Sequence, residues 1–145
     1  MKLNYKIIKT GLSGIVAILV VFFASPVPVL FAASPVEVEI VALDHWPIRR
    51  ALEPTLDMLK EFGDKISITQ IDADSKEGKA RLKSSGMKGH IPVVIFVNGE
   101  YTHTVNDHEV VFKNFPVDSD SPMKIDGKWS AGNVKAVIEA ILGAN

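Results

Sequence analysis

The sequence predicts an α/β protein in which a mixed central sheet is flanked by helices and preceded by an N-terminal apolar segment. Three observations predict this class. Two strand-like runs are separated by a stretch of helical spacing, the pattern of a parallel strand pair joined by a crossover helix. A third, wholly apolar run is followed by hairpin turn residues, and an amphipathic stretch closes the chain. Elements in this order build one sheet with helices packed on its faces.

The N-terminal 33 residues form a segment of their own. Three lysines within the first nine residues precede an uncharged stretch from Thr10 to Val36. A basic start followed by an apolar run is the layout of an export signal, and the run approaches the length of a membrane-spanning helix. We therefore expect residues 1–33 to be either a removed signal peptide or an uncleaved transmembrane anchor. Residues 34–145 are expected to form the domain, in the periplasm or at the cell exterior, secreted or membrane-anchored.

The first strand and the first helix of the domain follow directly. Val36 to Leu43 alternates and then becomes wholly apolar, as a strand does when it enters the buried middle of a sheet. Apolar residues then recur at helical spacing between Trp46 and Phe62, which predicts a helix. Pro47 suits its first turn, where a missing N–H costs nothing. Pro54 lies inside the helix and is expected to kink it.

A second strand and helix complete the crossover unit. Ile66 to Ile71 alternates and is rich in β-branched residues, so it predicts a strand parallel to the first. Asp74 or Ser75 is expected to cap a helix that runs to about Lys83. Asp74 and Glu77 also have the spacing of a capping box.

The next segment has the pattern of a strand followed by two hairpins. Val93 to Val97 is wholly apolar, which is typical of a central strand covered on both faces. Asn98-Gly99 is a strong hairpin signal, and Asn106-Asp107 is a weaker one. We therefore expect Glu100 to Val105 and His108 to Phe112 to continue the sheet as an antiparallel meander.

The C-terminal part is predicted to be a loop and then a helix. Asn114 to Lys128 contains two prolines and a glycine, which indicates a loop. Ser130 is a suitable N-cap, and an apolar stripe runs from Val134 to Leu142. This last helix is expected to cover one face of the sheet.

Two local motifs resemble a known family. Glu53-Pro54-Thr55-Leu56-Asp57 is similar to the kinked-helix segment of thioredoxins. Gly89-His90-Ile91-Pro92, followed by VVIFVNGE, resembles their cis-proline strand and turn. The similarity to the thioredoxin-like superfamily covers about Val36 to Glu100 and the last helix, and it implies a thioredoxin-like fold with a cis-proline at Pro92. The chain departs from the family at His90, which looks inserted, and in the longer span from Tyr101 to Lys128.

The chain contains no cysteine. Counting back from Pro54, the Cys-x-x-Cys motif of the family falls on Trp46 to Arg49, so Trp46 and Arg49 occupy the positions of the lost cysteines. Thiol–disulfide exchange needs an attacking thiolate and a second sulfur to resolve the mixed disulfide. We therefore exclude this chemistry for the chain alone and expect a non-catalytic domain without a cofactor.

The resemblance leaves a peptide-binding groove as the leading functional interpretation. In this family the backbone just before the proline can pair with an extended peptide, and Ile91 would supply those groups. His45 and Trp46 would lie beside Ile91 and Pro92 at the carboxyl ends of the strands, where open α/β sheets bind ligands. The alternative is that Pro92 only fixes a turn and that Trp46 fills the core.

Two other functions stay open. Asp44, His45 and His90 would reach the same rim with nitrogen and oxygen donors, so they are weak metal candidates for a histidine- or metal-dependent enzyme. No His-x-x-His or His-x-x-x-His pattern supports a metal site. A redox helper whose cysteines come from a partner chain is the third possibility.

Charge indicates the class of partner. Three of the 16 basic residues precede residue 34, so the domain carries 13 basic against 17 acidic residues and a formal charge of −4. A mildly acidic surface argues against nucleic acid. We expect an extracytoplasmic protein or peptide as the partner, with the membrane contacted through the N-terminal segment.

Overall fold

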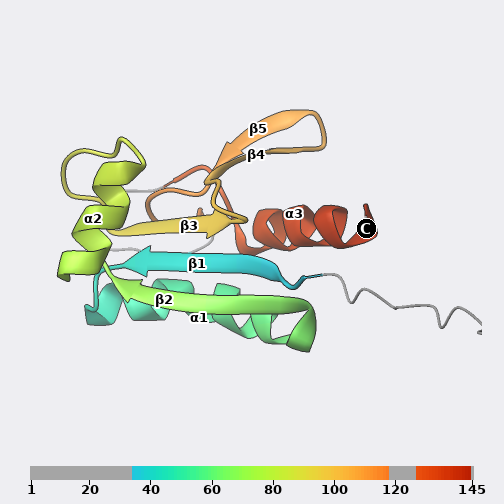
Figure 1. Ribbon diagram of the computed structural model, residues 1–145, viewed down its shortest axis with the longest axis horizontal. Helices are drawn as coiled ribbons and strands as arrows, with labels where there is room; N and C mark the ends of the chain where they lie inside the picture. The colour runs from blue at the N-terminus through green and yellow to red at the C-terminus, as the bar shows by residue number, and fades with distance from the viewer. Residues whose placement is uncertain (1–33, 118–126, 145) are drawn as a thin grey trace, which may run out of the picture. The chain divides into compact units, whose positions relative to one another are not determined.

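The computed structural model describes residues 34–117 and 127–144 (Figure 1). The predicted signal or anchor segment, residues 1–33, lies outside the described residues. The chain divides into two units, Met1–Phe31 and Ala32–Asn145, and every described element belongs to the second. Within the two described ranges, no helix combines the length and the apolar character that crossing a membrane requires.

The elements alternate between strand and helix before a hairpin and a final helix. In chain order they are β1 (Val36–Ala42), α1 (Trp46–Lys60), the 3-10 helix η1 (Gly63–Lys65), β2 (Ile66–Asp72), α2 (Lys76–Ser84), β3 (Val93–Val97), β4 (Thr102–Val105), β5 (His108–Val111) and α3 (Ala131–Gly143).

A three-stranded mixed sheet in the order β2-β1-β3 lies at the centre (Figure 1). β1 is parallel to β2, with Val36 opposite Ile66, and antiparallel to β3, with Ile40 opposite Ile95. The predicted α/β class, the mixed sheet and the parallel pairing of the first two strands are therefore confirmed.

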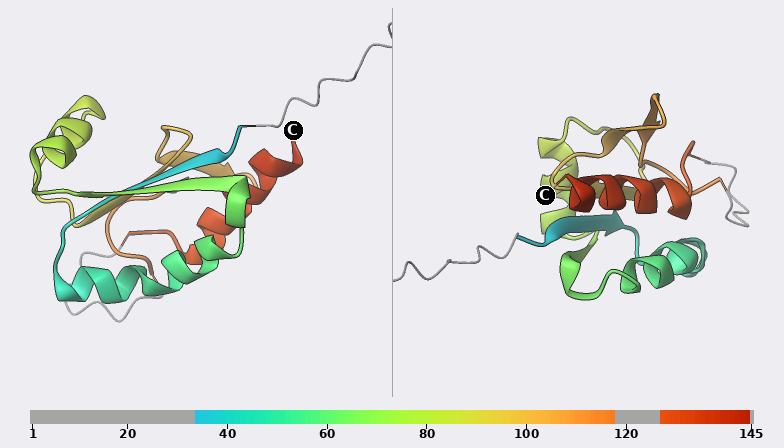
Figure 2. Two further views of the ribbon diagram at one scale, coloured as in Figure 1. Left: turned by 60° about the horizontal axis from the view of Figure 1, so that its bottom comes forward. Right: turned by 90° about the vertical axis from the view of Figure 1, so that its right-hand side faces the viewer.

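Helices cover both faces of this sheet. α1 and α3 contact each other on one face, and α2 packs against β1 and β2 on the other (Figure 2). β1 shows the alternation that this requires, because Val38 and Ile40 are buried whereas Glu37 is exposed and Glu39 half-buried. All five residues of β3 are buried, as expected for a strand with apolar neighbours on both faces.

The predicted meander is wrong in one respect. β4 and β5 form a separate two-stranded sheet, so the single continuous sheet expected from the sequence is not formed. The outer side of β3 is instead closed by the residues that follow β5. The N–H of Ile95 donates to the carbonyl of Phe112 over 3.0 Å, and the N–H of Asn114 donates to the carbonyl of Val93 over 2.8 Å.

Burial explains why the chain pairs in this way. The Asn98-Gly99 turn forms as predicted, with φ of 48° and 85°. Beyond it, β4 exposes Thr102 and Thr104, whereas Phe112 and Phe115 are fully buried. A strand that is apolar on both faces is best completed by a segment that brings aromatic side chains into the core.

The helix caps agree with the sequence in two of three details. Ser130 begins α3 in a capping box with Asn133. Ser75 is the N-cap of α2, and its hydroxyl accepts a hydrogen bond from the N–H of Gly78 over 2.9 Å. The predicted capping box between Asp74 and Glu77 is therefore wrong, because the helix begins one residue later than that spacing requires.

Candidate functional site

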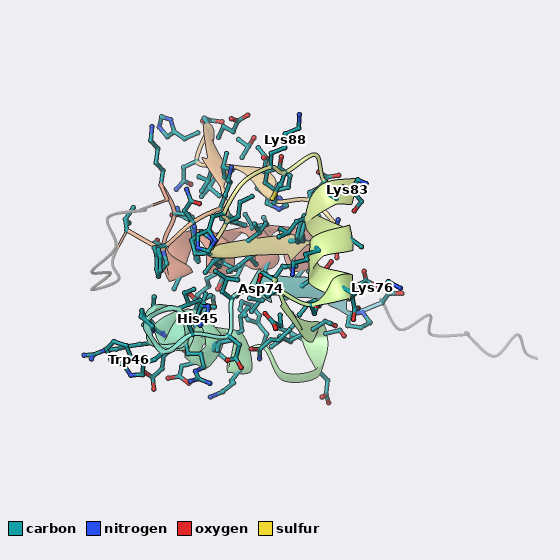
Figure 3. The ribbon with its side chains drawn as sticks, turned by 90° about the vertical axis from the view of Figure 1, so that its left-hand side faces the viewer. His45, Trp46, Asp74, Lys76, Lys83 and Lys88 are labelled. Carbon is teal, nitrogen blue, oxygen red and sulfur yellow. The ribbon has the colours of Figure 1, made fainter. Side chains whose placement is uncertain are left out.

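The candidate site lies at the carboxyl ends of β1 and β2, where α1 begins and β3 is entered (Figure 3). The N–H of Leu43 donates to the carbonyl of Pro92 over 3.0 Å, and the N–H of His45 donates to the carbonyl of Leu43 over 2.9 Å. These bonds bring the start of α1 and the start of β3 together. His45 and Trp46 therefore lie at the end of the sheet that Ile91 and Pro92 also approach.

Trp46 is an exposed side chain. It is 62% exposed. Only two other large apolar side chains in the described residues are more than a third exposed, namely Ile68 and Val117. The guanidinium of Arg50, one turn further along α1, lies 5.7 Å from the centre of its ring, within the range of a cation–π contact. The alternative that Trp46 fills the core is therefore wrong.

The helix register explains this exposure. α1 buries a stripe that contains Ile48, Leu52, Thr55 and Leu59. At roughly 100° per residue, Trp46 lies about half a turn away from this stripe, so it points away from the sheet. The i, i+4 spacing of Trp46 and Arg50 was the sequence signal for their pairing.

A second basic residue lies beside Trp46. Arg49 donates from Nη1 to Oδ1 of Asp44 over 3.0 Å. Both side chains are about two-thirds exposed, so this ion pair adds little to stability and leaves Arg49 accessible. The N-terminal end of α1 therefore presents one aromatic and two guanidinium groups to solvent.

A cavity of about 290 Å³ adjoins this turn. Ile48, Leu52 and Leu56 of α1 form an apolar wall, and Asp44, Arg49 and Gln70 lie among the polar residues that line it. Sequence reasoning did not find this cavity, because its lining comes from strands and a helix far apart in the chain.

Ile91 and Pro92 are placed differently from the expectation. Both side chains are buried, and Ile91 is only 5% exposed. No peptide bond in the described residues is cis, so the Ile91–Pro92 bond is trans and the predicted cis-proline is wrong. The trans form is the favoured one, and the turn before β3 is made by Gly89, with φ of 85°.

The backbone of Ile91 is not paired within the described residues, although the residue is buried. Neither its N–H nor its carbonyl forms a hydrogen bond with the described part of the chain. The neighbouring residues are paired, since the carbonyl of Pro92 accepts from Leu43 and that of Val93 accepts from Asn114. A peptide group next to a paired strand is the usual starting point for main-chain pairing with a bound segment.

The weak metal candidates do not form a metal site. Asp44, His45 and His90 are all exposed, and Asp44 is paired with Arg49. Among the residues that the structure describes, no three His, Cys, Asp or Glu side chains are grouped so that they could hold a metal ion.

The comparisons with known proteins assign no function to this arrangement. No model of a protein family matches the chain, and no curated protein matches it significantly. The chemistry of the site is therefore inferred from its own groups, namely an exposed tryptophan, two arginines and backbone groups of Ile91 that are unpaired within the described residues.

Proposed function

We propose that the chain is a thioredoxin-like domain that has lost thiol chemistry and binds an extended segment of another protein outside the cytoplasm. The strand order β2-β1-β3, with β1 parallel to β2 and antiparallel to β3, is compatible with that fold. The absence of cysteine leaves binding as the activity that such a scaffold retains.

The exposure of Trp46 is the observation that carries this proposal. An aromatic side chain presents roughly 200 Å² of surface, so the 62% that reaches solvent is about 120 Å². Burying that area under a partner is worth about 3 kcal/mol. Tryptophan and arginine also dominate the binding energy of protein interfaces, and here Trp46 begins a helix that carries Arg49 and Arg50 about one turn further on.

The backbone of Ile91 supports an extended conformation for the bound segment. Its N–H and carbonyl offer one donor and one acceptor next to the paired end of β3. An extended segment that bonds to both would lie along the same end of the sheet as Trp46. Main-chain bonds would then hold the segment, and Trp46 would select apolar or aromatic side chains within it.

Crosslinking in intact cells tests the proposal. We expect the set of proteins crosslinked to the full chain to be lost in Trp46→Ala and retained in Val117→Ala, a matched control at another exposed apolar side chain, 59% accessible. Circular dichroism establishes that both variants are folded. An unchanged partner set in folded Trp46→Ala would rule the groove out.

Amide exchange supplies an independent readout. Ile91 is buried, so replacing its side chain would damage the fold rather than test the groove. Its unpaired N–H should exchange rapidly in the free protein and slow down when a recovered partner is added. If the partner protects other amides and leaves Ile91 unchanged, the bound segment does not pair with this backbone.

The proposed location has its own test. The basic start and the apolar run of the N-terminal segment support export from the cytoplasm. The mass of the mature chain distinguishes the two forms, because a removed signal peptide leaves a chain that begins close to Ser34 and an anchor leaves the full length. A full-length chain recovered from the cytoplasm would contradict export.

A further inference from the structure

One edge of the central sheet is left open. β2 pairs with β1 on one side, and within residues 34–117 and 127–144 no strand pairs with it on the other. The left view of Figure 2 shows β2 running along this edge, with α1 set below the sheet. The opposite edge of the sheet is closed, since the outer side of β3 forms hydrogen bonds with the backbone of Phe112 and Asn114.

Apart from the charged Asp72 at its end, β2 lacks the devices that normally protect an edge strand. Ile66 to Ile71 reads ISITQI and contains no charged residue and no proline. β2 is seven residues long and pairs with β1 throughout without a bulge. Ser67, Thr69 and Gln70 are exposed, and Ile68 is 39% exposed although it is apolar. Such an edge is a template for pairing with another strand.

We propose that a second copy of this chain pairs with β2, so that two β2 strands run antiparallel and two three-stranded sheets join into one. A two-fold axis perpendicular to the sheet keeps each face on its own side, so opposed residues must face the same way. The register centred on Ile68 satisfies this condition. It places Ile68 opposite Ile68 of the second copy, and Ser67 opposite Thr69 of the second copy.

The side chains favour this register. The two exposed isoleucines bury each other at the axis, and a serine–threonine pair on the other face is a favourable cross-strand combination. No charge lies at the centre of this register, because Ile66 opposes Gln70, Ser67 opposes Thr69 and Ile68 opposes itself. Beyond this centre Lys65 opposes Ile71 of the second copy and Asp64 opposes Asp72, so the uncharged centre and not the charges at its ends favours the pairing.

The absence of native cysteine makes a direct test possible in intact cells with the full chain. In the proposed register the Cα atoms of opposed residues lie about 4.5 to 5.5 Å apart, within the range that a disulfide bridges. We expect Ile68→Cys to give a covalent dimer of twice the chain mass under oxidising conditions. Val117→Cys, exposed and remote from β2 in the chain, is the matched control and should remain monomeric. Equal dimer yields from the two variants would overturn the proposal.

Charge substitutions test the register. Ser67 and Thr69 are exposed, so lysines there leave the monomer folded. Adding Ser67→Lys and Thr69→Lys to Ile68→Cys sets like charges opposite each other twice and should abolish the covalent dimer. Ser67→Lys with Thr69→Glu sets opposite charges together and should retain it. A dimer that is insensitive to these changes, or a crosslinked product that contains a different protein, would overturn the pairing. Neither outcome bears on the Trp46 site.

Discussion

Gly78 is a residue that the packing of α2 requires. A Cβ at this position would overlap the carbonyl oxygen of Asp72 and come within 2.8 Å of the Cα of Ala73. Its N–H also donates to the capping hydroxyl of Ser75. Helix α2 therefore begins in contact with the end of β2, and only a residue without a side chain permits that contact.

We expect Gly78→Ala to lower the free energy of unfolding by about 2 kcal/mol, because the backbone must move to relieve the overlap. The matched control is Gly132→Ala in α3, where a Cβ would meet only the Oγ of Ser130 at 3.5 Å. There the better helix propensity of alanine should leave stability unchanged or raise it by up to about 1 kcal/mol. Urea unfolding followed by circular dichroism compares the two. Equal effects would show that the close approach does not constrain α2.

Thr55 is a buried polar residue whose hydroxyl is not satisfied. The residue is 1% exposed, and its Oγ1 has no hydrogen-bond partner in the described part of the chain. Thr55→Val keeps the shape and removes the unsatisfied hydroxyl, so we expect a gain of about 1 kcal/mol in unfolding free energy. Thr102→Val, at an exposed position of β4, should change little. A loss of stability in Thr55→Val would mean that the hydroxyl is bonded in solution.

At the residue scale, the sequence predicted a candidate site at the start of the first helix and left its chemistry open. Trp46 could be placed at the start of a helix, and the apolar stripe of that helix already implied that it points outward. The peptide bond before Pro92 could not be predicted from the local motif, because the turn there is made by Gly89 and its positive φ.

At the element scale, Arg81 ties α2 to the sheet. Its Nε lies 2.9 Å from both carboxylate oxygens of Glu39 in β1, and its Nη2 donates to the carbonyl of Gly99 in the turn after β3 over 3.3 Å. Its guanidinium also lies 3.7 Å from the ring centre of Phe96. Both members of the ion pair are about three-quarters buried, so this contact is far less screened than the surface pairs.

Arg81→Met keeps the aliphatic stem but leaves the carboxylate of Glu39, about three-quarters buried, without its partner. We therefore expect it to lower the free energy of unfolding by about 2 kcal/mol. Lys83→Met, on the exposed side of the same helix, should stay within about 0.5 kcal/mol of the original chain. A double-mutant cycle with Glu39→Gln isolates the pair. Additive losses in that cycle would show that the two residues act independently.

Lys135 joins α3 to the residue that follows α1. Its Nζ donates to Oε2 of Glu61 over 2.8 Å, and this hydrogen bond and charge raise the pKa of Lys135 above its usual 10.5. A raised pKa stabilises the fold below the unfolded-state value and loses that effect as pH rises through the folded-state value. Lys135→Met should therefore be slightly less stable at neutral pH and equal to the original chain at strongly alkaline pH. Thermal unfolding across this range measures the difference, and a pH-independent gap would contradict it.

The elements themselves follow closely from local sequence, and their pairing follows less closely. β1, α1, β2, α2, β3 and α3 begin and end near the predicted residues, since periodicity and caps are local signals. The partner of β3 is different, because the burial of Phe112 and Phe115 decides it against the nearer β4. Long-range burial of this kind is not encoded in a hairpin signal.

At the scale of the whole domain, one apolar core connects the sheet to α1 and α3. Its members include Ile40, Leu59, Phe96, Trp129 and Ile138. Trp129 is fully buried, and its Nε1 donates to the carbonyls of Lys113 and Asn114 over 3.1 and 3.2 Å. Because the chain has no cysteine, no disulfide adds to the stability that this core provides.

The two tryptophans of the chain therefore report on different regions. In Trp46→Phe the remaining emission comes from buried Trp129, so we expect acrylamide to quench it weakly and denaturation to follow the same curve as circular dichroism. In Trp129→Phe the emission of Trp46 should be strongly quenched. Separate denaturation curves in Trp46→Phe would show that the core does not unfold as one unit.

The central position of β1 has a consequence for how the fold is reached. β1 is the first described element to be synthesised, yet its two neighbours in the sheet are β2 and β3. The edge of β1 that pairs with β3 therefore stays unpaired until β3 has been made, and the outer edge of β3 is closed only once Phe112 and Asn114 have followed. Non-local pairings of this kind slow folding and leave apolar strands open to aggregation. We therefore expect the nascent chain to be most prone to aggregation before β3 and Phe112 have been made.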